Sequence, residues 1–133
     1  GRASTGNLIP KNTTAMTAVE KVLPNLQGKV LSFSYRIPTD IVASSDITLN
    51  LGREVSEEEL KKFFVNKCAT SQYINMNSES LVSMDYEMEE VSGVIDAQWL
   101  KTNGNVVKVV LWYDNEWGYS SRVLDLANKL LLL

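Results

Sequence analysis

The sequence predicts an α+β fold with a mixed, largely antiparallel sheet and helices packed on one face of it. The predicted strands cluster along the chain and do not alternate strictly with helices, which favours α+β over a doubly wound α/β fold. Asn103-Gly104 lies between two runs of β-forming residues and is the strongest short signal for a hairpin. The run "VVKVVLW", from Val106 to Trp112, is apolar at both alternating positions. We therefore expect it to form a central strand that is covered on both faces.

The first third of the chain predicts one helix and two strands. Thr13 and Thr14 precede "AMTAVEKVL", whose apolar residues follow helical spacing. A threonine at the N-cap can accept a hydrogen bond from a free N–H group of the first turn. Pro24 ends this helix. Residues 29–37 alternate in the manner of a strand, and residues 41–51 are rich in β-formers and predict a second strand.

A second helix is predicted from Ser56 to about Ala69. Ser56 is its expected N-cap, and Glu59 stands three residues later, which is the spacing of a capping box. Val55 and Leu60 are placed to form the hydrophobic staple of the same helix start.

The last third of the chain predicts three strands and a helix. The strands are expected over residues 80–86, 94–102 and 105–113. The helix is expected to begin near Tyr119 or Ser120 and to carry an apolar stripe on one side. This stripe consists of Val123, Ala127, Leu130 and Leu131.

The composition limits the chemistry and the partners. The 133 residues carry a net charge of −3 and no histidine, so there is no broad basic field for nucleic acid and no His-based metal site or Cys–His pair. No apolar run reaches the roughly 18–20 residues of a membrane span, and the single cysteine fits a reducing, cytoplasmic compartment. That cysteine, Cys68, follows Leu60 and Phe64 at helical spacing, so we interpret it as part of a core stripe.

A phosphate pocket is one interpretation of Thr13, Thr14 and Arg36. Helix N-termini favour anions, and an arginine at the end of the next predicted strand could meet an anion held there. The alternative is an ordinary helix cap and a solvated arginine. Asp114 and Asn115 have a similar plain interpretation, as a turn that leads into the last helix.

Three segments resemble the glyceraldehyde-3-phosphate dehydrogenase family. They are "GRASTGNLIPKNTTAMTAVEKVLPNLQGKV", "YRIPTDIVASSDITLNL" and "VKVVLWYDNEWGYSSRVLDLA", in family order and at family spacing. The motif "WYDNEWGYS" is the most specific part. The resemblance covers essentially the whole chain and is weakest between Asn66 and Gly93.

The resemblance implies an activity and a set of site residues. The family enzymes oxidise an aldehyde with NAD and inorganic phosphate to an acyl phosphate, within a cytoplasmic homotetramer. Arg36 matches the arginine that binds the substrate and inorganic phosphates, and Thr13 matches a threonine that helps to hold inorganic phosphate. Arg2 matches a basic residue of the bordering loop. Asn115 matches the asparagine that hydrogen-bonds the nicotinamide carboxamide, and Tyr119 matches a tyrosine packed behind that contact.

The sequence also departs from the family. The catalytic cysteine and histidine of the family, and its nucleotide-binding half, lie upstream of the position that Gly1 matches, and Cys68 is not that cysteine. We therefore expect this chain to be inactive alone and not to hold NAD. Thr14 replaces a family glycine beside Thr13, so its side chain lies within the expected phosphate site.

The resemblance divides the chain into residues 1–118, which form the substrate and phosphate side, and residues 119–133. The latter form a helix that packs against the nucleotide-binding half in the family. Without that half, the apolar stripe faces water, and we expect the chain to self-associate, either through this helix or through the sheet, which forms subunit contacts in the family.

Three functions stay open. The first is part of a phosphorylating glyceraldehyde-3-phosphate dehydrogenase, and the second is the corresponding part of a relative that acts on erythrose 4-phosphate. Tyr113 and Tyr119 favour the first, because the relative tends to carry other residues at these two positions. The third is a standalone, non-catalytic binding or assembly module derived from the family.

Overall fold

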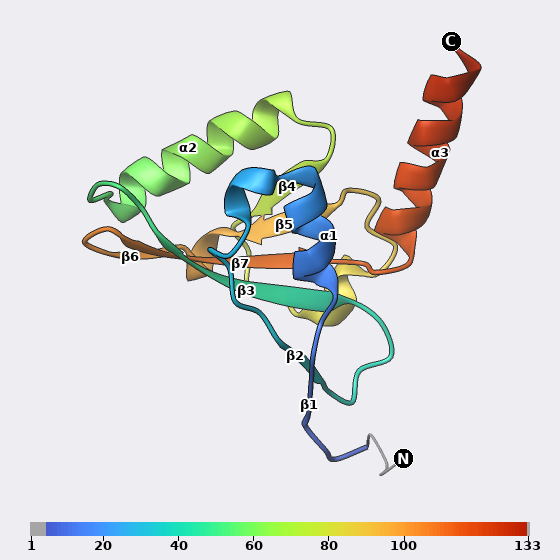
Figure 1. The fold of residues 1–133 in the computed structure, drawn as a ribbon, viewed down its shortest axis with the longest axis horizontal. Coiled ribbons are helices and arrows are strands. Elements are labelled where there is room, and N and C mark those ends of the chain that lie inside the picture. The colour runs from blue at the N-terminus through green and yellow to red at the C-terminus, as the bar shows by residue number, and fades with distance from the viewer. Residues whose placement is uncertain (1–4, 133) are drawn as a thin grey trace. The chain divides into compact units, whose positions relative to one another are not determined.

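The computed structural model describes residues 5–132 and divides the chain into two compact units, Gly1–Asp40 and Ile41–Leu133. Figure 1 shows the elements of both units along the chain. Arg2, a predicted supporting residue, lies outside the described residues.

The first unit contains a short antiparallel ladder and one helix. Strand β1 (Ile9–Lys11) pairs with β2 (Ser34–Arg36), and helix α1 (Ala15–Val22) and a 3₁₀ turn, η1 (Pro24–Leu26), lie between them in the chain. The strand predicted over residues 29–37 is therefore wrong for its first five residues. The partner strand offers only three residues, so the ladder ends at Ser34, and the three residues before it stay exposed, Leu31 completely.

Helix α1 begins where the two threonines predict it. Thr14 is the N-cap residue but its side chain makes no capping bond, whereas the hydroxyl of Thr13 accepts a hydrogen bond from the N–H of Ala15 at 3.2 Å. The helix ends before Pro24, as expected. None of its eight residues is buried.

The second unit is built on a five-stranded sheet in the order β3-β7-β5-β4, with β6 pairing to β7. Only the pair β4–β5 is parallel, which confirms the predicted mixed, largely antiparallel sheet. The strands are β3 (Ala43–Asn50), β4 (Ile74–Asn77), β5 (Gly93–Asp96), β6 (Lys101–Asn103) and β7 (Val106–Tyr113).

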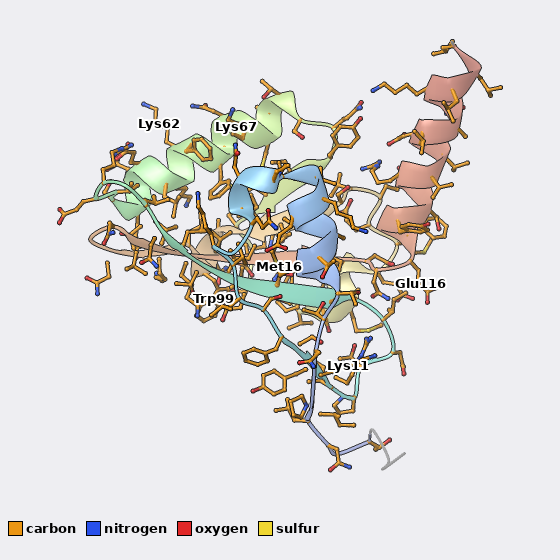
Figure 2. All side chains as sticks on the ribbon, viewed as in Figure 1. Lys11, Met16, Lys62, Lys67, Trp99 and Glu116 are labelled. Atoms are coloured by element: carbon orange, nitrogen blue, oxygen red, sulfur yellow. The ribbon has the colours of Figure 1, made fainter. Side chains whose placement is uncertain are left out.

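Helix α2 (Glu57–Thr70) covers one face of this sheet and forms the larger core with it. In Figure 1 the helix lies along the sheet, and in Figure 2 Lys62 and Lys67 project from its outer side. Cys68 is half-buried and packs against this core, as its spacing predicts. The buried residues of this core are Leu60, Ile95, Leu100, Val107 and Val109.

A smaller core covers part of the opposite face. Val94 pairs with Trp112 across the strands, and the ring of Trp112 stacks on that of Tyr86 with 5.5 Å between ring centroids. The other end of β7 is open on this face, where Lys108 forms a 2.8 Å ion pair with Asp46 of β3. Strand β7 is central, as predicted, but it is covered on both faces over only part of its length.

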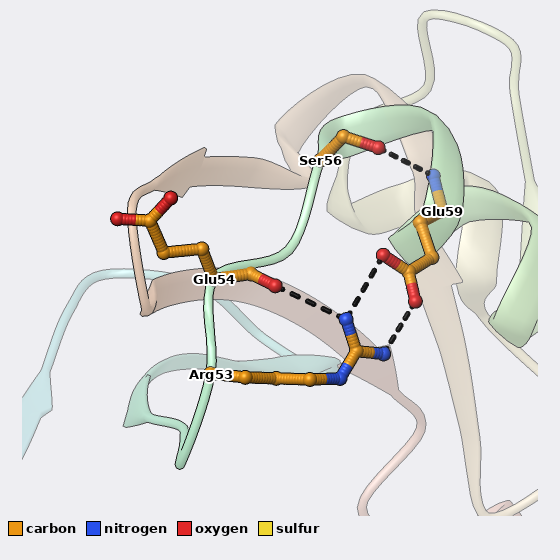
Figure 3. A network of polar contacts seen from close by, with 4 residues as sticks. All are labelled: Arg53, Glu54, Ser56 and Glu59. Carbon is orange, nitrogen blue, oxygen red and sulfur yellow. Dashed lines mark hydrogen bonds and ion pairs between the residues drawn. The ribbon is translucent and has the colours of Figure 1, made fainter.

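The start of α2 confirms half of the predicted capping box. The hydroxyl of Ser56 accepts a hydrogen bond from the N–H of Glu59 at 3.1 Å. The carboxylate of Glu59 is paired instead with the guanidinium of Arg53, which also donates to the carbonyl of Glu54 (Figure 3). Val55 packs against the cluster that contains Leu60, in agreement with the predicted staple.

The hairpin at Asn103-Gly104 is confirmed. Asn103 pairs with Val106, and Gly104 adopts a φ of 60°, a left-handed conformation that glycine tolerates without steric cost.

One predicted strand is wrong and another is interrupted. Residues 80–86 contain the 3₁₀ helix η2 (Ser83–Tyr86), whose start is held by Asp85, which accepts from the N–H of Val82 at 2.7 Å. Residues 94–102 divide into β5, the 3₁₀ turn η3 (Ala97–Trp99) and β6, because Asp96 accepts from the N–H of Gln98 at 3.1 Å and bends the chain.

Helix α3 (Trp117–Leu131) follows β7 directly and begins two residues before the predicted start. Figure 1 shows it leaving from the end of β7. Its predicted apolar stripe is exposed: Val123, Leu130 and Leu131 are 47%, 61% and 83% accessible to solvent. Within residues 5–132, no helix is both long and apolar enough to cross a bilayer.

Candidate functional site

The predicted phosphate-binding residues lie in the first unit. Arg36 is the last residue of β2, and its exposed guanidinium forms no hydrogen bond or ion pair with residues 5–132. Thr13 is half-buried and Thr14 is exposed, both at the start of α1. The ladder places Arg36 opposite Ile9, at the end of β1 that is farther from Thr13. The structure therefore shows an available guanidinium and an available helix start, but no hydrogen bond links Arg36 to either threonine.

The predicted cofactor-contacting residues lie at the junction of β7 and α3 in the second unit. Here a shallow cavity of about 260 Å³ opens to solvent. Asn115 is exposed, and its carboxamide forms no hydrogen bond with any residue that the structure describes. Tyr119 stands one helical turn further on and is 72% accessible. The cavity is lined by Ser92, Tyr113, Asp114, Asn115, Gly118, Tyr119 and Arg122.

Asp114 holds this junction together. Its side chain is only 2% accessible, and one carboxylate oxygen accepts from the N–H groups of Glu116 and Trp117 at 2.9 and 2.8 Å. The other oxygen accepts from the N–H of Met88 at 2.9 Å. Burial alone would raise the pKa of the carboxyl, but the N–H groups of Trp117, Glu116 and Met88 together outweigh it and hold the pKa below its usual range.

Arg122 ties the first turns of α3 to the sheet. Its guanidinium lies 4.8 Å from the ring centroid of Tyr73 and donates to the hydroxyl of Ser92 at 3.2 Å. Its Nε is 2.8 Å from a carboxylate oxygen of Asp125, one turn further along the helix. The side chain therefore lies against three neighbours while it lines the cavity that holds Asn115.

The roles of Asn115 and Tyr119 stay predictions, whereas the predicted turn at Asp114 is confirmed by its hydrogen bonds to Glu116 and Trp117. The sequence did not predict the contact of Asp114 with Met88 or the contacts of Arg122. Asp114 lies three residues before Trp117, which is the usual spacing between a capping side chain and the N–H group that it accepts from. The sequence therefore carries a signal for this helix start. The contacts to Met88 and Tyr73 have no such signal, because they join segments far apart in the sequence.

Comparison with known proteins identifies one family. A family model described as "Glyceraldehyde 3-phosphate dehydrogenase, C-terminal domain" matches residues 1–115. A cytosolic glyceraldehyde-3-phosphate dehydrogenase 3 of Zea mays is 43% identical over 133 residues, which is 98% of this chain and 40% of that protein. The glyceraldehyde-3-phosphate dehydrogenase of Phaffia rhodozyma is 39% identical over 132 residues, which is 96% of this chain and 39% of the relative. A chloroplastic relative of Guillardia theta is 40% identical, over 95% of this chain and 33% of its own length.

The α+β fold and the match to the family model define the C-terminal domain of a dehydrogenase. The chain belongs to the glyceraldehyde-3-phosphate dehydrogenase family and spans about two fifths or less of the length of these relatives.

Proposed function

We propose that this chain supplies the phosphate-binding and nicotinamide-orienting residues of an NAD-dependent, phosphorylating glyceraldehyde-3-phosphate dehydrogenase. The observation that carries the proposal is the match of residues 1–115 to the C-terminal domain of that family, together with relatives that bear this name. The cytoplasm is the proposed compartment, since a relative described as cytosolic is similar over 98% of the chain.

Arg36 is the proposed anchor for the substrate and inorganic phosphates. A guanidinium offers a planar fork of donors that matches two oxygens of a phosphate, and such charge-assisted bonds are about twice as strong as neutral ones. The side chain is exposed and unengaged within residues 5–132, so it can bind a phosphate without first breaking an internal contact. The first turn of α1, next to Thr13 and Thr14, adds N–H groups that favour an anion, although the hydroxyl of Thr13 already accepts from Ala15.

Asn115 is the proposed contact for the nicotinamide carboxamide, with Tyr119 beside it. An asparagine carboxamide has two donors and one acceptor, so it can pair with another carboxamide and fix the face that the ring presents. Its position at the rim of an open cavity leaves these groups free for a ligand.

The reacting nucleophile and its base are proposed to come from polypeptide outside these 133 residues. The chain has no histidine, and burial raises the pKa of its only thiol, Cys68, which therefore stays protonated and unreactive near neutral pH. Cys68 packs against the core under α2 and is not among the residues that line the cavity with Asn115.

The Arg36→Leu variant of the full-length dehydrogenase subunit tests the phosphate role. Loss of one charge-assisted contact costs about 1.5–3 kcal/mol, so we expect kcat/KM for phosphate and for glyceraldehyde 3-phosphate to fall about 10- to 150-fold, with little change in the KM for NAD. Arg53→Leu is the matched control, because Arg53 is also an exposed arginine but is engaged at the start of α2. Unchanged kinetics in the Arg36 variant contradict the proposal.

The purified chain alone is expected to show no dehydrogenase activity. The measurement is NADH formation from glyceraldehyde 3-phosphate and inorganic phosphate, with the full-length enzyme as the positive control. Turnover by the purified chain would show that the nucleophile lies within these residues, which the proposal excludes.

A further inference from the structure

We propose that Asp114 is a positioning residue that sets the direction of the Asn115 carboxamide through a link to the segment of residues 88–92. This inference rests on the proposed contact between Asn115 and the nicotinamide. It adds a residue that touches no ligand and a segment that lies 23–27 residues earlier in the chain.

The first step of the argument is the turn around Asn115. One oxygen of Asp114 accepts from the N–H groups of Glu116 and Trp117. Asn115 therefore lies in a tight turn that these two hydrogen bonds bridge. The carbonyl of Asp114 also accepts from the N–H of Gly118 at 3.2 Å. The backbone of Asn115 is therefore held even though its side chain is solvent-exposed.

The second step is that Asp114 does more than cap a helix. A cap needs only the N–H groups at the helix start, whereas the second oxygen of Asp114 accepts from Met88 at 2.9 Å. Met88 has a φ of 63°, an uncommon value for a residue other than glycine, and such conformations persist where the surroundings hold them. The carboxylate thus joins the turn around Asn115 to a second segment whose backbone is constrained.

The third step is that two further contacts join the same two segments. Gly118 is buried, and a Cβ at this position would lie 3.0 Å from the carbonyl oxygen of Val91, so the helix start approaches this segment closely. Arg122 donates to the hydroxyl of Ser92, one turn further along α3. Three points of contact, at Asp114, Gly118 and Arg122, therefore set the start of α3 against residues 88–92.

The test measures NAD binding to the full-length enzyme by calorimetry, well below the unfolding temperature. We expect Asp114→Ala to weaken NAD binding about 10- to 100-fold, as the loss of one or two hydrogen bonds to the nicotinamide carboxamide would. In the Asn115→Ala background the same change should alter the Kd by no more than a factor of about two, because residues that act as one unit are not additive.

The Asp114→Asn variant distinguishes a positioning role of Asp114 from a role in helix capping alone. Asparagine is a good N-cap, but its amide has one acceptor oxygen in place of two, so the cap and the Met88 contact cannot both be kept. We expect Asp114→Asn to weaken NAD binding as well, whereas a role in capping alone predicts wild-type affinity. Ser56→Ala is the control, because it removes a helix cap from α2, away from the junction.

The outcomes are distinguishable. If Asn115→Ala weakens NAD binding while both Asp114 variants bind like the wild type, the positioning role is wrong and the proposed function stands. If Asn115→Ala leaves the Kd for NAD unchanged, the proposed nicotinamide contact is wrong, and the positioning role of Asp114 is wrong as well. If Asp114→Ala does not fold, the Kd of Asp114→Asn decides the question.

Discussion

At the scale of single residues, Asp114 shows how a buried charge can be held without a cation. The residue is almost inaccessible, and three backbone N–H groups replace the water that a carboxylate would otherwise keep. Hydrogen bonds to the charged form favour it, which is why the pKa lies below its usual range in spite of burial. The fold therefore favours the ionised form of this residue over the protonated form.

This predicts a pH dependence with a definite sign. A carboxyl whose pKa is lower in the folded state binds fewer protons there, so its stabilisation is complete above its unfolded pKa and is lost as the pH falls through the folded value. We expect Asp114→Asn to lower the free energy of unfolding at pH 7 by about 1–3 kcal/mol. The difference in the free energy of unfolding between the variant and the wild type should become smaller below about pH 4. Urea unfolding of both proteins between pH 3 and pH 7 measures it. A difference that stays constant over this range contradicts the assignment.

At the scale of elements, the start of α2 combines a neutral cap with an exposed ion pair. The hydroxyl of Ser56 satisfies one N–H group of the first turn, and the Arg53–Glu59 pair stands beside it at the surface. The two contacts are adjacent, but they differ in physical origin. Salt screens an exposed ion pair, whereas it has little effect on a hydrogen bond between two neutral groups.

We expect Ser56→Ala to lower the free energy of unfolding by about 1 kcal/mol, because one N–H group of α2 loses its partner. Glu59→Gln should have a smaller effect that disappears at high salt. Thermal unfolding at low and at high ionic strength measures both changes. A salt-sensitive effect of Ser56→Ala would contradict the assignment of Ser56 to a neutral hydrogen bond. A salt-insensitive effect of Glu59→Gln would contradict the assignment of Glu59 to an exposed ion pair.

At the scale of the whole molecule, α3 leaves a large apolar surface uncovered. Only Gly118 among its fifteen residues is buried, and leucines on several sides of the helix are mostly exposed. Large exposed apolar patches usually mark association sites. The exposed leucines are Leu124, Leu126, Leu130, Leu131 and Leu132.

We propose that the isolated chain self-associates through this helix. Burying one leucine side chain contributes roughly 1.5–3 kcal/mol, so several together favour association at micromolar concentration. Sedimentation velocity should show oligomers of the wild-type chain and a shift towards monomer when Leu130 and Leu131 are both changed to glutamate. Asn128→Glu, on the polar side of α3, is the control and should behave like the wild type. A monomeric wild-type chain contradicts the proposal.

The sequence by itself determined the elements whose signals are local. The extent of α2 followed from the spacing of Leu60, Phe64 and Cys68 and from the cap at Ser56. The hairpin followed from Asn103-Gly104. Local signals suffice here because helical periodicity, caps and tight turns depend on residues within about four positions of one another. Asn115 and Tyr119 belong to one continuous motif and line one cavity, while their contact with a nicotinamide and the meeting of Arg36 with Thr13 stay predictions.

Only the tertiary structure decided the elements and contacts that depend on distant partners. Strand β4, "INMN", alternates apolar and polar residues, but it is only four residues long and two of them are asparagines, which are uncommon in strands; it is a strand because it pairs in parallel with β5. Asp114 reads as a turn residue until Met88, 26 positions earlier, is seen to donate to it. In each case a hydrogen bond is satisfied by a group whose position depends on the folded chain, and a buried polar group takes the partner that the fold brings to it.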